Sequence, residues 1–286
     1  MKFKSVVAKN FSRAANTYDQ QAVLQQEIGH RLVDRLALIK ISPAVILDLG
    51  CGTRFFSRDL ADLYPNAHLI NLDIAEGMIL YSDPTRVNPS QSLIQADGDY
   101  LPFKSQSIDF VFSNCVLNWF TDPKNVLEEI YRVLKPEGLF LFSTFGPDTL
   151  KELRNSFAKV DPNPHVNTFM DMHDLGDLLL KVNFSDPVVD METLTLTYSS
   201  LTGLLTDLKQ TGSHTVNTSI PRGLNRKPLL NALEAAYERY RTEDHRLPAT
   251  FEIIYGHAFV PSQKNLYRAD EEGIVRIPLE HLMLRR

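Results

Sequence analysis

Acidic residues stand where predicted strands end, and the first of them leads into a turn with two glycines. Residues 45–53 read Val-Ile-Leu-Asp-Leu-Gly-Cys-Gly-Thr, so an apolar strand should run into Asp48 and the glycine turn. Asp73 ends the next apolar run. Glycine lets a turn approach a ligand where a Cβ would collide, and a carboxylate at the second strand tip suits the two ribose hydroxyls of a nucleoside. The order of these residues predicts a site for a small, nucleoside-containing ligand.

The glycine turn matches neither of two common phosphate-binding motifs. Positions 50–55 read Gly-Cys-Gly-Thr-Arg-Phe, which is not Gly-x-Gly-x-x-Gly, and no Gly-Lys-Ser/Thr follows as in a P-loop. The segment resembles instead the first motif, Asp-x-Gly-x-Gly-x-Gly, of the Rossmann-like S-adenosylmethionine-dependent methyltransferases. Arg54 replaces the third glycine of that motif, and its side chain should point away from the methionine end of the cofactor. A turn that only joins a strand to a helix is the alternative.

The rest of the chain supplies the elements that would position these residues. Leu24, Ile28, Leu32 and Leu36 recur every fourth residue and predict an amphipathic helix before the first strand. Strands and helices then alternate, with strands expected at 68–72, 92–96, 108–113 and 139–144, helices at 55–64, 75–81 and 126–134, and a closing turn at 135–138. Such alternation requires a parallel sheet with helices on both faces.

After residue 144 the pattern changes. Two helices are expected in 145–182, and two β-rich stretches, 187–198 and 249–260, are separated by helical segments at 200–211 and 228–241. By resemblance to the methyltransferases, these stretches form a terminal hairpin. The predicted fold is therefore α/β, a Rossmann-like seven-stranded sheet, mostly parallel with one antiparallel strand, with helical lid insertions. We expect one domain, 1–260, with a helical cap (1–40), a cofactor-binding core (41–144), lid insertions (145–182 and 199–245) and the hairpin, then a partly disordered tail (261–286).

Composition restricts the class of protein. The 286 residues are 43% hydrophobic with a net charge of −5 and a pI near 5.9, which gives no electrostatic case for nucleic acid as the main partner. The N-terminal segment has no long apolar run, so neither a signal peptide nor a membrane span is expected. Cys51 and Cys115 offer no disulfide framework, and neither they nor the eight histidines have metal-ligand spacing. We expect a cytoplasmic protein without a metal.

The resemblance to methyltransferases implies roles for residues at the strand ends. Asp48 should meet the ammonium group of S-adenosylmethionine, directly or through the backbone, and Asp73 should meet the ribose hydroxyls. Asp97 should meet the adenine amino group, with a solvated turn carboxylate as the alternative. Ile74 and Met78 should sandwich the adenine, with plain core packing as the alternative. The full set of expected cofactor contacts is Asp48, Gly50, Cys51, Gly52, Thr53, Asp73, Ile74, Met78, Asp97, Gly98 and Asn114.

Segments outside the cofactor motifs carry a more specific resemblance. They are Phe11-Ser-Arg-Ala-Ala-Asn-Thr-Tyr-Asp, Ser113-Asn-Cys-Val-Leu-Asn-Trp, Thr144-Phe-Gly-Pro-Asp-Thr-Leu, Asp171-Met-His-Asp-Leu-Gly and Ala249-Thr-Phe-Glu-Ile-Ile-Tyr-Gly. Together they resemble the malonyl-acyl carrier protein O-methyltransferases of biotin synthesis, over about residues 8–260. The resemblance implies that the free carboxylate of a malonyl thioester, on acyl carrier protein or coenzyme A, takes the sulfonium methyl group in one displacement. A methyl ester and S-adenosylhomocysteine result.

The same resemblance implies an acceptor site. The family's N-terminal tyrosine matches Tyr18, whose hydroxyl would act in catalysis by holding the carboxylate, with helix packing as the alternative. The family's His-x-Asn-Arg-Phe segment has an arginine suited to clamp a carboxylate, and this chain has Thr168 there. Arg154 and Arg222 are candidate replacements. The expected substrate contacts are Asn114, Trp119, His165, Thr168 and Phe169.

The partner implied by this resemblance is acyl carrier protein, which is acidic and would need a basic surface. The candidates are Lys151, Arg154, Arg222, Arg226 and Lys227, with a solvated basic face as the alternative. Two other functions stay open. A mitochondrial assembly factor of respiratory complex I, which hydroxylates a protein arginine, shares the segment Phe-Gly-x-Asp-Thr-Leu-x-Glu-Leu-Arg. A non-catalytic binding module would keep the fold and lose cofactor affinity through Arg54.

Overall fold

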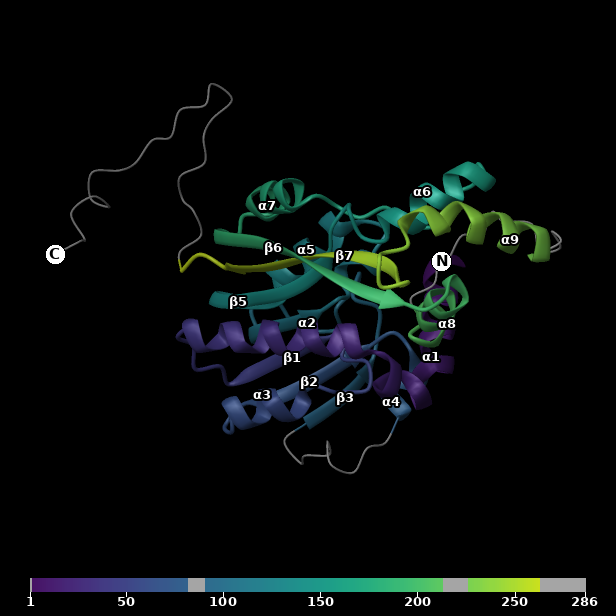
Figure 1. Ribbon diagram of the computed structural model, residues 1–286. Helices are drawn as coiled ribbons and strands as arrows, with labels where there is room; N and C mark the ends of the chain where they lie inside the picture. The colour runs from purple at the N-terminus through teal and green to yellow at the C-terminus, as the bar shows by residue number, and fades with distance from the viewer. Residues whose placement is uncertain (1, 82–90, 213–225, 263–286) are drawn as a thin grey trace, which may run out of the picture.

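The computed structural model describes residues 2–81, 91–212 and 226–262. Seven strands in this part of the chain form one sheet in the order β3-β2-β1-β4-β5-β7-β6 (Figure 1). Strands β1 to β5 pair in parallel, while β7 runs antiparallel to both β5 and β6. The predicted Rossmann-like sheet with one antiparallel strand is confirmed. The strands are β1 (Val45–Leu49), β2 (His68–Asp73), β3 (Gln91–Gln95), β4 (Ile108–Asn114), β5 (Leu134–Phe145), β6 (Ser185–Tyr198) and β7 (Leu247–Phe259).

Helices cover both faces of the sheet (Figure 1). They are α1 (Lys2–Gln21), α2 (Val23–Asp34), α3 (Ser57–Leu63), α4 (Glu76–Leu80), α5 (Pro123–Val133), α6 (Lys151–Val160), α7 (Met172–Lys181), α8 (Leu201–Gln210) and α9 (Arg226–Tyr237). The two helices expected in 145–182 are α6 and α7. None of the helices in the described ranges is long and apolar enough to cross a membrane.

Two apolar cores form because neighbouring residues of a strand point to opposite faces of the sheet. On β4, Phe110 and Phe112 belong to one core and Val111 belongs to the other, and all three are fully buried. Helices α2, α3, α6, α8 and α9 contribute to the first core, and α5 and α7 to the second. The predicted stripe of α2 is confirmed, since Ile28 and Leu32 have no exposed surface.

The turn predicted at 135–138 is wrong. Strand β5 begins at Leu134, five residues before the predicted start, and residues 135–138 form an irregular stretch inside it. Its pairing with β4 jumps from Leu134 opposite Ile108 to Leu139 opposite Phe110. Glu137, with φ 64°, donates its N–H to the Val260 carbonyl at 2.8 Å. The backbone of residues 135–138 therefore forms hydrogen bonds with the neighbouring chain. These turn-forming residues produce a bulge within β5 instead of a turn before it.

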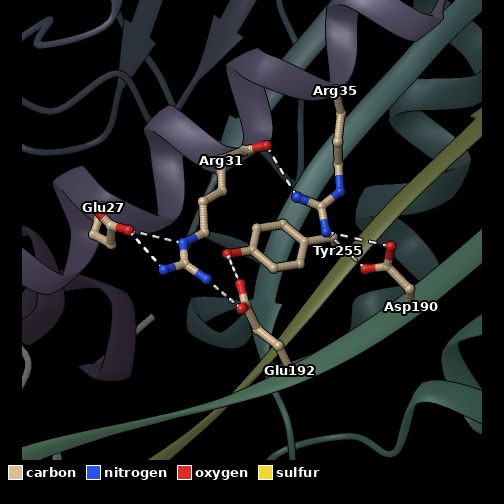
Figure 2. Close-up of polar contacts among 6 residues, drawn as sticks. All are labelled: Glu27, Arg31, Arg35, Asp190, Glu192 and Tyr255. Atoms are coloured by element: carbon tan, nitrogen blue, oxygen red, sulfur yellow. Dashed lines mark hydrogen bonds and ion pairs between the residues drawn. The ribbon is translucent and has the colours of Figure 1, made fainter.

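A network of charged side chains joins α2 and the short 3-10 helix that follows it (Arg35–Leu38) to the edge of the sheet formed by β6 and β7 (Figure 2). Arg31 pairs with Glu192, which also accepts a hydrogen bond from the Tyr255 hydroxyl at 2.7 Å. Arg35 pairs with Asp190 at 3.0 Å and lies over the Tyr255 ring, 3.7 Å from its centroid. Segments more than 150 residues apart are thus held together.

Candidate active site

The glycine turn after β1 has a backbone that few other residues adopt. Gly50 has φ 74° and Gly52 has φ 53°, both in the left-handed region that favours glycine. A Cβ on Gly50 would meet a Val116 methyl group at 2.3 Å, whereas a Cβ on Gly52 would meet nothing within 4 Å. The N–H groups of Gly50 and Cys51 donate to the Leu72 carbonyl on β2 at 2.7 and 3.1 Å. The turn is therefore fixed to the neighbouring strand, with open space beside Gly52.

Asp73 joins the glycine turn to the start of α4. Its Oδ2 accepts from the Gly52 N–H at 3.0 Å, and its Oδ1 accepts from the Ala75 N–H at 2.7 Å. Burial raises the pKa of Asp73, and the N–H groups of Ala75 and Gly52 offset part of this effect. The carboxylate is thus held in one orientation at the end of β2, as a group that binds a diol requires.

A cavity at the carboxyl ends of the strands, here called the strand-end cavity, brings together residues from distant segments of the chain. Its walls come from α1, the start of α2, the glycine turn, the ends of β2, β4 and β5, and the segments after β3 and β4. Predicted site residues that line it are Tyr18, Gly50, Gly52, Asp73, Ile74, Met78, Asp97, Gly98, Asn114 and Trp119. Among the described residues, no three His, Cys, Asp or Glu side chains gather in a way that could hold a metal ion.

A smaller cavity, the turn cavity, is also lined by Gly50 and Gly52 of the glycine turn. Three predicted cofactor contacts, Asp48, Cys51 and Thr53, line this cavity and not the strand-end cavity. Tyr18 and Asn114 line both. Burial, with a smaller contribution from Asp73, raises the pKa of Asp48 to about 8. The two cavities meet at Tyr18 and Asn114, so the Asp48 carboxyl lies close to the strand-end cavity without forming its wall.

Arg54, which replaces the third glycine of the motif, has φ 64°. A left-handed backbone explains why a glycine suits this position. The side chain is only 4% exposed, lines neither cavity, and donates from Nη2 to the Tyr81 carbonyl at the end of α4, at 2.5 Å. Helix α3 begins at Ser57 and not at residue 55 as predicted, because the left-handed residue delays the helical backbone. Arg54 therefore stabilises the C-terminal end of α4, the helix that contains Met78.

We expect Arg54→Gly to be more stable than Arg54→Ala by about 1 kcal/mol, because both lose the bond to Tyr81 and only glycine relieves the left-handed strain. The free energy of unfolding in urea measures this difference. At Arg58, an exposed residue of α3, the order should reverse, since glycine disfavours a helix by about 1 kcal/mol relative to alanine. Equal stability of the two Arg54 variants would contradict backbone strain at residue 54.

Helix α1 forms a wall of the strand-end cavity that the sequence reasoning did not predict in full. Lys4, Phe11 and Tyr18, seven residues apart and so on one helix face, all line it. Lys4 Nζ lies 2.5 Å from Asp97 Oδ1 and also pairs with Asp99. The seven-residue spacing was the signal that could have identified Lys4. The carboxylate expected to meet adenine is thus held by a cation from α1.

Tyr18 reaches from α1 to the point where the two cavities meet. Burial raises the pKa of Tyr18 well above its ordinary value, and the neighbouring Cys115, Asp73 and Asp19 add to this effect. The hydroxyl therefore keeps its proton and can donate it in a hydrogen bond. Asn114 is oriented nearby, since its Nδ2 donates to the Gln25 carbonyl at 2.9 Å.

The structure does not place all predicted substrate contacts on one cavity. Thr168, His165 and Phe169 line a separate cavity beside α6, the α6 cavity, which shares no lining residue with the strand-end cavity. His165 instead bonds Asp161 at 2.8 Å. Phe169 packs edge-on against Phe145 with 5.9 Å between ring centroids, and Phe145 lines the strand-end cavity. The two cavities therefore share a wall of aromatic rings.

The candidate cations are only partly within the described residues. Arg154 lines the α6 cavity together with Thr168, but it donates to the carbonyls of Pro147 and Thr149, both at 2.8 Å. Lys151 pairs with Asp148 at 2.9 Å. Arg222 and the side chain of Arg226 lie outside the described residues, and Lys227 is exposed on α9.

Comparison with known proteins identifies the class. Residues 47–142 match the family model of a methyltransferase domain. The YcgJ protein from Bacillus subtilis has the same fold, with a TM-score of 0.57 at 16% identity, covering 82% of this chain and 100% of that chain. Phosphoethanolamine N-methyltransferase 2 from Haemonchus contortus, solved with S-adenosylhomocysteine, has a TM-score of 0.50 at 15% identity, covering 85% of this chain and 53% of that chain. The matched domain and this fold define a methyltransferase.

Relatives over the full length narrow the class to one family. The malonyl-[acyl-carrier protein] O-methyltransferase of Gallionella capsiferriformans is 45% identical over 269 residues, covering 91% of this chain and 92% of the relative. The enzyme numbered 1 under the same name in Coxiella burnetii is 38% identical over 282 residues, covering 99% of this chain and 96% of the relative. The chain belongs to the family of malonyl-[acyl-carrier protein] O-methyltransferases.

Proposed function

We propose that this protein methylates the free carboxylate of malonyl-acyl carrier protein, or of malonyl-coenzyme A, as a cytoplasmic step of biotin synthesis. The observation that carries the proposal is the strand-end cavity, where Tyr18 faces the same space as the glycine turn and Asp73. The acceptor is inferred from the relatives, which are malonyl-[acyl-carrier protein] O-methyltransferases. Removing one charge from a short dicarboxylate would let it pass through chain extension as an ordinary acyl group.

The residues present fit S-adenosylmethionine as the methyl donor. The open space beside Gly52 is room for a ligand that a Cβ would partly fill. At the end of β2, both carboxylate oxygens of Asp73 are oriented by backbone N–H groups, those of Gly52 and Ala75. Asp73 would hold the ribose, Ile74 and Met78 the adenine, and Asp48 the ammonium group from behind the turn. When bound, the cofactor supplies the methyl group that the carboxylate takes in a single displacement.

The chain's own residues would act by alignment and by excluding water. A malonyl carboxyl has an ordinary pKa of about 4 and is ionised at pH 7, so no general base is needed. Tyr18 keeps its proton, and its hydroxyl would donate a hydrogen bond to one carboxylate oxygen, leaving the other oxygen directed at the methyl group. Phe11 packs edge-on against Trp119, 5.2 Å between centroids, and the pair would keep water from the nucleophile.

The pKa of Asp48 predicts that cofactor affinity rises with pH. In the protein without cofactor, Asp48 has a pKa of about 8. Below pH 8 its carboxyl must therefore lose a proton when the ammonium group of the cofactor binds beside it. We expect the Kd of S-adenosylhomocysteine to fall by up to about tenfold per pH unit between roughly pH 6 and 8. Calorimetry in two buffers of different ionisation enthalpy should detect the released proton. Asp48→Asn is the control, and an equal pH slope in that variant would contradict the assignment.

The function itself is tested in two steps. The protein is titrated with S-adenosylhomocysteine, and malonyl-carrier protein is then incubated with the protein and S-adenosylmethionine and analysed by mass spectrometry. We expect binding and a gain of one methyl group in mass. Binding without the mass gain would direct the search to another acceptor, such as a protein arginine. Absence of binding would favour the non-catalytic module.

A further inference from the structure

A groove lies beside the candidate active site, and its lining residues come from the junction of α1 and α2, strand β6 and helix α8. Helix α8 packs against α1 (Figure 1). We call it the α8 groove. Leu24, Leu196 and Phe251 supply apolar surface. Its polar lining includes Gln20, Gln21, Gln25, Thr197, Thr202 and Thr206. The groove belongs to neither of the cavities that hold the predicted cofactor contacts.

Gln25 connects the groove to the site of transfer. Among the described residues, it alone lines the α8 groove, the strand-end cavity and the turn cavity. Its carbonyl accepts from Asn114 Nδ2 at 2.9 Å, which fixes the start of α2 to the end of β4. Tyr18 also lines both the strand-end cavity and the turn cavity. A ligand in the groove that passed Gln25 would therefore arrive at the Tyr18 hydroxyl.

The lining selects for an uncharged, flexible chain that carries amides. Amide and hydroxyl side chains both donate and accept, so they match the N–H and C=O groups of such a chain. Among the described residues that line the groove, Asp207 alone is charged, and its Oδ2 already accepts from the Tyr198 hydroxyl at 2.6 Å. Val23, also in the lining, is 64% exposed. None of the described lining residues is a cation that would pair with a free dicarboxylate or a nucleotide.

We propose that the α8 groove binds the pantetheine arm of the thioester acceptor and leads its malonyl end past Gln25 to Tyr18. The inference rests on the proposed function and deepens it by assigning the path of the substrate. The α6 cavity is the competing path. It shares no lining residue with the strand-end cavity, and the ring of Phe145 stands between the strand-end cavity and Phe169.

The test compares two thioesters, malonyl-carrier protein and malonyl-N-acetylcysteamine, of which the second lacks most of the arm. Thr206→Trp places a large ring in the groove from an exposed position of α8, and Thr202→Trp is a second variant of the same kind. Lys209→Trp, exposed on the same helix outside the lining, is the matched control. Ala158→Trp fills the α6 cavity instead. Thermal unfolding establishes that each variant is folded.

We expect the groove variants to raise the KM for malonyl-carrier protein about tenfold, while the KM for the short thioester changes by less than about twofold. Lys209→Trp should change neither. Equal effects on the two thioesters, or a selective effect of Ala158→Trp alone, would overturn the inference. A wild-type protein that methylates neither thioester would overturn the proposed function, and this failure is seen before any variant is made.

Discussion

Replacing Asp73 by alanine is expected to weaken the binding of S-adenosylhomocysteine by about a hundredfold or more, because a charged acceptor of two ribose hydrogen bonds is lost. The same change leaves the N–H groups of Gly52 and Ala75 without the carboxylate that orients them. The glycine turn would then lose one of its links to β2. Calorimetric titration measures the Kd directly.

Asp109→Ala is the matched control for this prediction. Asp109 also accepts from two backbone N–H groups, those of Ala44 and Val45 at 3.1 and 2.8 Å, at the opposite end of β1. We expect this variant to lose stability while its Kd for S-adenosylhomocysteine changes by less than about threefold. If the two variants lost affinity equally, the effect of Asp73 would come from general loosening of the sheet and not from contact with the ribose.

Replacing Tyr18 by phenylalanine is expected to lower kcat/KM for the malonyl acceptor by about 10- to 100-fold, the usual range for a hydrogen bond to a charged group. The Kd of S-adenosylhomocysteine should change by less than about threefold, since the ring and its packing against α4 remain. Steady-state rates and calorimetry on the same preparation separate the two effects. An unchanged kcat/KM would leave Tyr18 as a packing residue of α1.

Tyr237→Phe controls for the loss of a buried tyrosine hydroxyl elsewhere. Tyr237 is fully buried on α9 and donates to the Pro248 carbonyl at 2.8 Å. Removing this hydroxyl should lower the free energy of unfolding by about 1 kcal/mol and leave kcat/KM nearly unchanged. A fall in kcat/KM equal to that of Tyr18→Phe would indicate that both variants act by loosening the helices around the sheet.

Local residue order was sufficient to predict the strands, the glycine turn and the acidic residues at the strand ends. Runs such as Val45–Leu49 must be buried, and parallel strands bring their carboxyl ends to one edge of the sheet. Asp73 and Gly52 therefore had to lie close together once the fold class was known. The turn predicted at 135–138 failed because neighbouring strands supplied backbone partners that the local sequence does not reveal.

The remaining parts of the site depend on contacts between residues far apart in the chain. Lys4 meets Asp97 across 93 positions, and Gln25 meets Asn114 across 89. No local pattern contains such pairs, because they arise only when α1 and α2 pack over the strand ends. Thr168 lines a separate cavity beside α6, and the pair of rings Phe145 and Phe169 lies between that cavity and the strand-end cavity. Residue type predicted the chemistry of the site, and the packing of distant helices decided which residues face it.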